Sequence, residues 1–419
     1  MKDTHKWTPG KIAMITVNCL LCLTIVVSGM VFFIDNSRIN NGSFPQNDND
    51  IPADTSNVDV QTDEPQTRTA RLMCAGDNLI QTNIYTQARQ RDEDGGYDFS
   101  YAYSGLRNII SLSNIAFINQ ESVFDTANEP SGEEVYNSPA ELLDEMINVG
   151  FDVFNQANNH IMDKDVFGIQ NNLSLFKSKS NILLTGLYDT RESMLTPQVR
   201  EVNGIRIAFV GFTEYLNDLV VPDDCDIGLV YLSDSRFTQS ELYGTMKLMI
   251  ENAKAAADVV CVSMHWQNEN STELDYSQIT ITNKLLEYGA DVIIGTGPQV
   301  LQPVEYMENG DGEEALVLWS LGNVISCQEN MSNILGGVAE INFEKDLATG
   351  KTKISSAYLI PTIAHYEADF ANIRVIPLHD YTEELASQHG IQDENFTYNY
   401  INDYYTNMFG DKLKVNYNN

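Results

Sequence analysis

Side chains of the kinds that bind metals or move protons recur where apolar runs of this sequence end. Asp77 closes the run RLMCAGD, and Glu121 closes NIAFINQE. The pair Asn159-His160 follows FDVFNQA, and His265 lies at the end of DVVCVSMHW. Carboxylate, amide and imidazole groups together form a ligand set suited to Mn, Fe, Mg or Zn. Two such ions can activate a water molecule and hold a phosphate, so the pattern indicates a candidate site for that chemistry.

Each of these residues also has a simpler structural explanation. Asp77 is suited to cap a helix that begins near Leu79, and Asn159 is a common turn residue. A histidine such as His265, next to Trp266, is often only packed and hydrogen-bonded. A shared site is favoured because the polar residues recur at the ends of successive strands, and such ends converge on one crevice in an α/β sheet.

The elements that must position these residues alternate between strands and helices. Near-continuous apolar runs are typical of strands buried on both faces, and their alternation with helix signals predicts an α/β fold. The expected strands are 71–77, 114–121, 151–157, 181–188, 205–212, 258–266, 291–297 and 315–323. The expected helices are 138–149, 239–257 and 276–288, followed by strands 336–344 and 353–366 and a terminal helix in the polar tail.

The amino-terminal region predicts a membrane anchor. Residues 12–34 form a run of 23 residues without a charged side chain, long enough to span a bilayer as a helix. Lys2, Lys6 and Lys11 precede this run and Asp35 follows it. The positive-inside rule therefore places residues 1–11 in the cytoplasm and the main domain outside the cell. A cleaved signal peptide is the alternative, although the run is longer than a usual signal core.

The amino-acid composition limits the kinds of environment and partner that fit this chain. Residues 35–69 are rich in Asn, Asp, Thr, Gln and Pro, which predicts a flexible linker. The formal net charge of −34 speaks against nucleic-acid binding, which needs a basic surface. The same charge disfavours an anionic polymer unless cations bridge the two. The four cysteines beyond the apolar run show no paired spacing, so neither a disulfide scaffold nor a zinc cluster is indicated.

Seven segments in chain order resemble the CapA-type family of poly-γ-glutamate capsule biosynthesis proteins. They cover the chain from about Arg71 to Cys327, and the membrane anchor with an external domain is also similar to that family. The combination of ANNH, VLQPVE and LGN is specific. The segments are AGDNLI (75–80), FINQES (117–122), YNSPAELLDEMINVGFDVFNQANNHIMD (136–163), GIRIAFVGFTEY (204–215), ADVVCVSMHWQNE (257–269), YGADVIIGTGPQVLQPVE (288–305) and WSLGNVIS (319–326).

The resemblance implies a metallophosphoesterase-like fold, a four-layer sandwich of two packed β-sheets flanked by helices. It implies a capsule synthesis domain over 70–327, completed by strands and tail in 328–419. It also implies partners: an anionic polymer such as poly-γ-glutamate and membrane-bound synthase subunits. Within the wider metallophosphoesterase pattern, the implied metal set is Asp77, Glu121, Asn159, His160 and His265. Asn159, His160 and His265 are the implied catalytic residues.

The segment DVIIGTGPQVLQPVE departs from the family pattern. Family members commonly have histidines at two positions of this loop, where this chain has Thr296 and Gln299, and a third pattern histidine is replaced by Leu79. Imidazole is a strong ligand for transition metals, whereas a hydroxyl or an amide is a poor one. We therefore expect at most one divalent ion, with Mg or Ca better suited than Mn or Zn to the oxygen-rich remainder.

Three functions remain open at this point. The first is a membrane-anchored extracellular factor for synthesis, export or anchoring of a poly-γ-glutamate-type polymer, with a cation bridging polymer and protein. The second is an extracellular metal-dependent phosphoesterase-like hydrolase. The third is a non-catalytic surface scaffold whose site has decayed, in which His160 and His265 could be replaced without loss. The missing histidines count against the hydrolase.

Overall fold

The computed structural model describes residues 66–391, 393–409 and 414–415. Within these ranges no helix combines the length and apolar character needed to cross a membrane. The expected transmembrane helix, 12–34, and the expected linker up to residue 65 lie outside them. The first strand begins at Thr67, so the last residues of the stretch expected as a linker already pair in a sheet.

The larger of two main sheets has nine strands in the described part of the chain. Strands β1, β2, β5 and β6 run parallel, whereas β14, β15 and β16 continue the sheet in antiparallel fashion. Strand β13 pairs with β1, and β17 pairs with β15. The sheet order is β16 (Ala371–Pro377), β15 (Thr352–Glu367), β14 (Leu335–Asp346), β1 (Thr67–Asn78), β2 (Ile115–Gln120), β5 (Val153–Asn155) and β6 (Leu183–Thr185), with β13 (Asn323–Ile325) and β17 (Lys414–Val415) beside this path.

The second main sheet has six strands, again counted over the described residues. Strands β8, β9, β10 and β12 are parallel, and β7 and β11 are antiparallel edge strands. A separate ribbon pairs β3 with β4. The sheet order is β11 (Val304–Glu308), β12 (Glu314–Leu318), β10 (Val292–Thr296), β9 (Val259–His265), β8 (Ile205–Thr213) and β7 (Gln198–Val202), and the ribbon is β3 (Ser131–Glu133) and β4 (Val135–Asn137).

Helices begin and end where local sequence signals place them. Thr238 and Asp275 each form a capping box at the start of α6 and α7. Gly150 and Gly289 end α4 and α7 in the left-handed conformation that glycine adopts without strain. The helices are α2 (Thr82–Arg91), α3 (Arg107–Ile110), α4 (Glu141–Val149), α5 (Asp165–Ser178), α6 (Gln239–Ala256), α7 (Tyr276–Tyr288), α8 (Glu383–Gln388) and α9 (Tyr398–Phe409), with 3-10 turns η1 (Ser104–Leu106), η2 (Ser193–Leu195), η3 (Met331–Ile334), η4 (Ala368–Phe370) and η5 (Leu378–Asp380).

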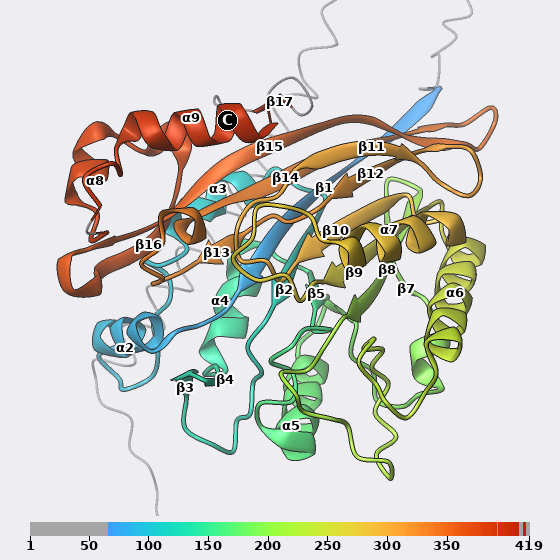
Figure 1. Cartoon of the computed structure of the whole chain (residues 1–419), viewed down its shortest axis with the longest axis horizontal. Coiled ribbons are helices and arrows are strands. Elements are labelled where there is room, and N and C mark those ends of the chain that lie inside the picture. The colour runs from blue at the N-terminus through green and yellow to red at the C-terminus, as the bar shows by residue number, and fades with distance from the viewer. Residues whose placement is uncertain (1–65, 392, 410–413, 416–419) are drawn as a thin grey trace, which may run out of the picture. The chain divides into compact units, whose positions relative to one another are not determined.

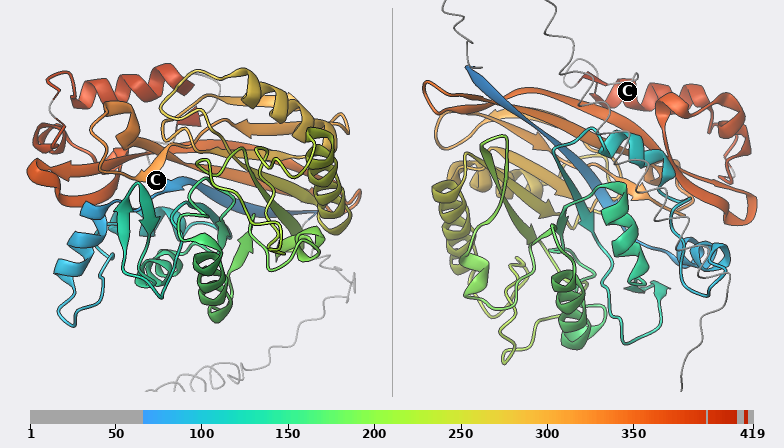
Figure 2. Two further views of the ribbon diagram at one scale, coloured as in Figure 1. Left: turned by 60° about the horizontal axis from the view of Figure 1, so that its bottom comes forward. Right: turned by 180° about the vertical axis from the view of Figure 1, so that it is seen from behind.

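The two sheets pack against each other around one apolar core. Phe117 of β2 stacks on Phe209 of β8, with ring centroids 6.2 Å apart and an interplanar angle of 12°. The outer face of the six-stranded sheet packs on α6 and α7 through Met246 and Leu285, among others. Figure 1 shows α6 and α7 together beside this sheet and α8 and α9 beside β15 and β16; Figure 2 shows the same grouping from two further sides. The expected α/β fold with sheets flanked by helices is confirmed.

Candidate functional site

Strand ends from both sheets bring the predicted polar residues together. Asp77 lies at the end of β1, and Glu121 directly follows β2. Asn159 follows β5, while His265 is the last residue of β9 and Thr296 the last of β10. All five side chains are buried, each at most 1% exposed. We call these residues, with the partners described below, the strand-end cluster.

His265 is the centre of the cluster and is held as a neutral ring. Its Nε2 lies 2.8 Å from Oδ1 of Asn159, which can only accept, so Nε2 carries the proton. Its Nδ1 then accepts from the Thr296 hydroxyl at 3.1 Å and from Nδ2 of Asn119 at 3.3 Å. Burial lowers the pKa of His265 to about 3. The ring therefore stays uncharged at neutral pH and links the two sheets by hydrogen bonds.

Asp77 has each side-chain oxygen occupied by an N–H donor. Asn119 donates to Oδ1 at 2.7 Å, and the backbone N–H of Gly297 donates to Oδ2 at 2.9 Å. Gly297 has a φ of 101°, and a Cβ there would lie 2.3 Å from the carbonyl oxygen of Trp266. Only glycine can therefore occupy this position without displacing the loop. Burial raises the pKa of Asp77 to about 7, and the donated hydrogen bonds limit that rise.

Glu121 is the exception in this otherwise satisfied network. Its side chain is fully buried, yet neither carboxyl oxygen has a hydrogen-bond partner. Oε1 lies 3.7 Å from Nε2 of His265, beyond hydrogen-bond distance. Burial, followed by the negative charge of Asp77, raises the pKa of Glu121 well above its usual range. Native proteins seldom leave a buried carboxyl without a partner, so this residue points to a ligand.

The outer part of the cluster contains residues that the sequence analysis did not single out. Nδ2 of Asn159 lies 3.1 Å from the Tyr215 hydroxyl, 3.1 Å from Oδ1 of Asn217 and 3.5 Å from Oε1 of Glu269. Tyr215 also donates to Glu269. Tyr215 and Asn217 follow the end of β8, so their position after a strand is the signal that would have indicated them. Glu269 is exposed and marks the solvent side of the cluster.

His160 pairs with Asp163 at the edge of the cluster. Its Nδ1 lies 2.9 Å from Oδ2 of Asp163, which also accepts from the backbone N–H of Tyr136 at 2.6 Å. The Tyr136 ring packs edge-on against the imidazole, with centroids 4.6 Å apart. Nδ2 of Asn217 lies 3.4 Å from the same Nδ1 and connects His160 to the rest of the cluster. The structure thus brings Asn159 and His265 into direct contact, and it joins His160, paired with Asp163, to them through Asn217.

The arrangement does not fit the expected single Mg, Mn, Zn or Ca ion held by these residues. Among the described residues no three His, Cys, Asp or Glu side chains are placed to bind one metal. Nδ1 of His265 lies 3.8 Å from Asp77, and Nε2 lies 3.7 Å from Glu121, so the two carboxylates flank opposite edges of the ring. An imidazole offers one nitrogen to one ion, and Asp77 already accepts N–H donors. The residues form a hydrogen-bonded network instead.

The loop that departs from the family pattern contributes to this network. Thr296 donates its hydroxyl to His265, and Gly297 donates its N–H to Asp77. Gln299 has a φ of 58° and directs its side chain to Gln328, whose Nε2 donates to Oε1 at 2.6 Å. At the two positions where the family pattern has histidines, Thr296 therefore donates a hydrogen bond to His265 and Gln299 accepts one from Gln328.

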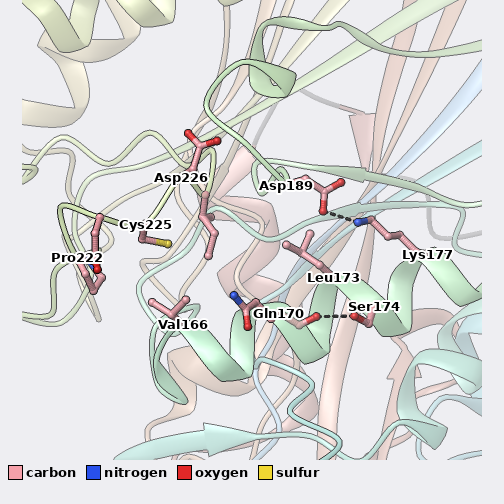
Figure 3. Close-up of a pocket in the computed structure, with 11 residues that line it drawn as sticks. Val166, Gln170, Leu173, Ser174, Lys177, Asp189, Pro222, Cys225 and Asp226 are labelled. Atoms are coloured by element: carbon pink, nitrogen blue, oxygen red, sulfur yellow. Dashed lines mark hydrogen bonds and ion pairs between the residues drawn. The ribbon is translucent and has the colours of Figure 1, made fainter.

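A cavity of about 570 Å³ lies elsewhere, between α5 and the segment 222–227 (Figure 3). Leu173, Val166 and Cys225 line it, and Lys177 pairs with Asp189 at its edge. It shares no residue with the strand-end cluster and contains no histidine. This cavity is therefore separate from the candidate site formed by the strand-end cluster.

Comparisons with known proteins agree with the sequence resemblance. A family model described as bacterial capsule synthesis protein PGA_cap matches residues 71–328. The PGA biosynthesis protein CapA of Bacillus subtilis (strain 168) is 31% identical over 178 residues, which are 42% of this chain and 43% of that protein. The capsule biosynthesis protein CapA of Bacillus anthracis is 27% identical over 180 residues, 42% of this chain and 40% of that protein. The matched part thus spans less than half of each relative.

Solved structures resemble this chain only weakly. A phosphatase from Mycoplasma pneumoniae has 13% sequence identity and a TM-score of 0.42, over 71% of this chain and 94% of that one. A similarity at this level does not assign a chemistry.

Proposed function

Since this chain belongs to the bacterial capsule synthesis protein family PGA_cap, we propose that it is a membrane-anchored extracellular factor for a poly-γ-glutamate-type capsule polymer. Its work would be synthesis, export or anchoring of that polymer beside membrane-bound synthase subunits. The observation that carries the proposal is the extent of the family match. Residues 71–328 contain every predicted site residue, from Asp77 to His265.

The location is the first part of the proposal. Residues 12–34 would cross the membrane, with residues 1–11 in the cytoplasm and 35–69 as a tether. The supporting observations are the uncharged run of 23 residues, the lysines that precede it and the net charge of −34. A strongly acidic domain is consistent with a soluble extracellular position.

The architecture is the second part. We assign a metallophosphoesterase-like sandwich, in which helices cover the outer faces of two packed sheets. Support comes from the shared apolar core between the sheets and from the carboxyl ends of β1, β2, β8, β9 and β10, which meet at one site. In α/β sheets this edge is where ligands bind.

The strand-end cluster favours binding of the polymer over metal-dependent hydrolysis. The hydrolase alternative needs ligands that hold metal and activate water. In this chain Asp77 accepts two N–H donors, and His265 uses both ring nitrogens in hydrogen bonds. The cluster is thus already arranged as a network of hydrogen-bond donors and acceptors, which is the kind of arrangement that recognises a ligand.

Deletion of the gene in its native host tests the proposed function. We expect the deletion strain to lose cell-associated polymer, measured as glutamate released by acid hydrolysis of the polymer after it is extracted from washed cells and freed of protein. Reintroducing the wild-type gene should restore the polymer. Unchanged polymer in the deletion strain would refute the proposed function, and protease accessibility of an epitope at residue 419 on intact cells tests the topology.

A further inference from the structure

Four carboxylates of the strand-end cluster share one network without a cation. Asp77 and Glu121 flank His265 at 3.8 Å and 3.7 Å. Glu269 contacts Asn159, which accepts from His265, and Asp163 joins through His160 and Asn217. In the described ranges no Lys or Arg forms an ion pair with any of these four carboxylates. Buried carboxyl groups normally have partners, and these have no Lys or Arg beside them in the part of the chain that the structure describes, so the network lacks a positive group that would hold its buried carboxyls in the ionised form.

Glu121 marks where that group would bind. It is fully buried, and both of its oxygens are without a hydrogen-bond donor. Nε2 of His265, which lies 3.7 Å from Oε1, donates to Asn159 instead. The two carboxyl oxygens of Glu121 would therefore be satisfied by a ligand that supplies N–H or O–H groups.

The remaining acceptors suit an ammonium group better than a metal ion. A metal would compete with the N–H donors on Asp77 and would find no free nitrogen on His265. An ammonium group instead supplies three N–H donors with a full positive charge, and its hydrogen bonds to carboxylates are short and strong. Glu269 is exposed, Tyr215 is half-buried and Glu121 is buried, so the cluster reaches solvent on the Glu269 side.

We propose that the strand-end cluster is a receptor for a primary ammonium group, which binds Glu121 in place of a metal. On the proposed function, on which this assignment rests, that group is the free amino end of a glutamate chain. The acidic cluster repels the repeating carboxylates of the polymer but attracts its single positive end. The protein would therefore recognise chain ends and not the body of the chain.

Calorimetric titration of the full chain in detergent tests this receptor. The titrants are two synthetic γ-linked glutamate oligomers that differ only in a free or an N-acetylated amino end, with free glutamate as a third. Every titration is run with EDTA and again with Mg²⁺ or Ca²⁺. The free-ended oligomer should bind at least about tenfold more tightly than the acetylated one, because a hydrogen bond to a charged group contributes that much or more. EDTA should change nothing.

Matched variants separate the ammonium contact from general effects. Glu121→Gln should abolish the preference for the free end. Glu340→Gln removes another carboxylate that is 4% exposed and also has an unpartnered oxygen, on β14, and should keep the preference. Glu269→Gln, at the exposed side, should reduce the preference and serves as the test if Glu121→Gln does not fold.

Several outcomes would overturn the receptor. They are equal affinity for the two oligomers, no binding of either, binding that requires Mg²⁺ or Ca²⁺, tighter binding of free glutamate than of the oligomer, or a preference that survives in Glu121→Gln. The proposed function fails by a different result, which is normal capsule polymer in the deletion strain. A polymer defect together with equal oligomer binding would refute the receptor alone.

Discussion

Replacing Glu121 with Met should stabilise the protein. The wild-type side chain holds two buried oxygens without donors, and an unsatisfied buried polar group costs about 1–3 kcal/mol. Met has a similar volume and no group that needs a hydrogen bond. We therefore expect the free energy of unfolding to rise by about 1–3 kcal/mol at pH 5. A residue whose removal stabilises the fold is characteristic of a functional site.

The gain should increase with pH. Burial raises the pKa of Glu121 above the ordinary value of 4.5, so the folded state retains a proton that the unfolded state releases. The stability from that proton is fully present below pH 4.5 and is lost as pH rises. Met does not titrate, so its advantage should grow by up to about 1.4 kcal/mol per pH unit.

Urea unfolding of the full chain at pH 5, 6 and 7 measures both effects. Glu145→Met is the control, because Glu145 is 7% exposed but pairs with Arg107. It should lose about 1–3 kcal/mol, since it leaves a charged partner unpaired. Destabilisation of Glu121→Met by more than about 1 kcal/mol would show that Glu121 has a stabilising partner and would refute the reasoning.

Three other changes probe the fold and its pH dependence. Gly297→Ala should lower the free energy of unfolding by about 1–3 kcal/mol through backbone strain. Gly244→Ala, in α6 with open space around the added Cβ, should instead raise it by about 0.5–1 kcal/mol. Equal melting temperatures of the two variants would contradict this. Phe209→Ala removes the ring stacked between the sheets and should cost about 3–5 kcal/mol in urea unfolding, and a loss under about 1 kcal/mol would place the sheets further apart. Burial lowers the pKa of His365 to about 3 and of His389 to about 4, from 6.5, so both stay neutral when folded. Their stabilising contribution is present above pH 6.5 and is lost as pH falls, by up to about 1.4 kcal/mol per pH unit for each. Replacing both histidines with Gln should therefore make the melting temperature fall less steeply as the pH is lowered below 6.5.

Long elements with strong local signals could be predicted from the sequence. Helix α7 begins after Asp275 and ends before Gly289, as its capping residue and terminal glycine indicate. The strands β8, β9 and β10 lie within a residue or so of the predicted runs. Helix α5 was missed because its start, at Asp165, has a positive φ and no side-chain cap, and its apolar pattern is weak. Short pairing strands such as β13, only three residues long, carry too little pattern to be found.

The composition of the candidate site was only partly predictable. Strand-end position identified Asp77, Glu121 and His265, because parallel strands bring their carboxyl ends to one edge. Side-chain direction was not accessible, so the contact of His160 Nδ1 with Asp163 was not predicted. Whether a side chain binds a metal or a hydrogen-bond donor depends on which atoms surround its oxygen and nitrogen atoms in the folded chain. The spacing of residues along the sequence does not give that information.

The proposed role of the strand-end cluster is tested most directly by the amount of capsule polymer on cells that carry a substituted cluster. The deletion strain is complemented with His265→Gln, and an epitope tag confirms that chain levels equal the wild type. We expect polymer at the level of the deletion strain, with Glu340→Gln restoring the wild-type amount. Wild-type polymer on cells that carry His265→Gln would contradict it, because the cluster would then be a structural remnant.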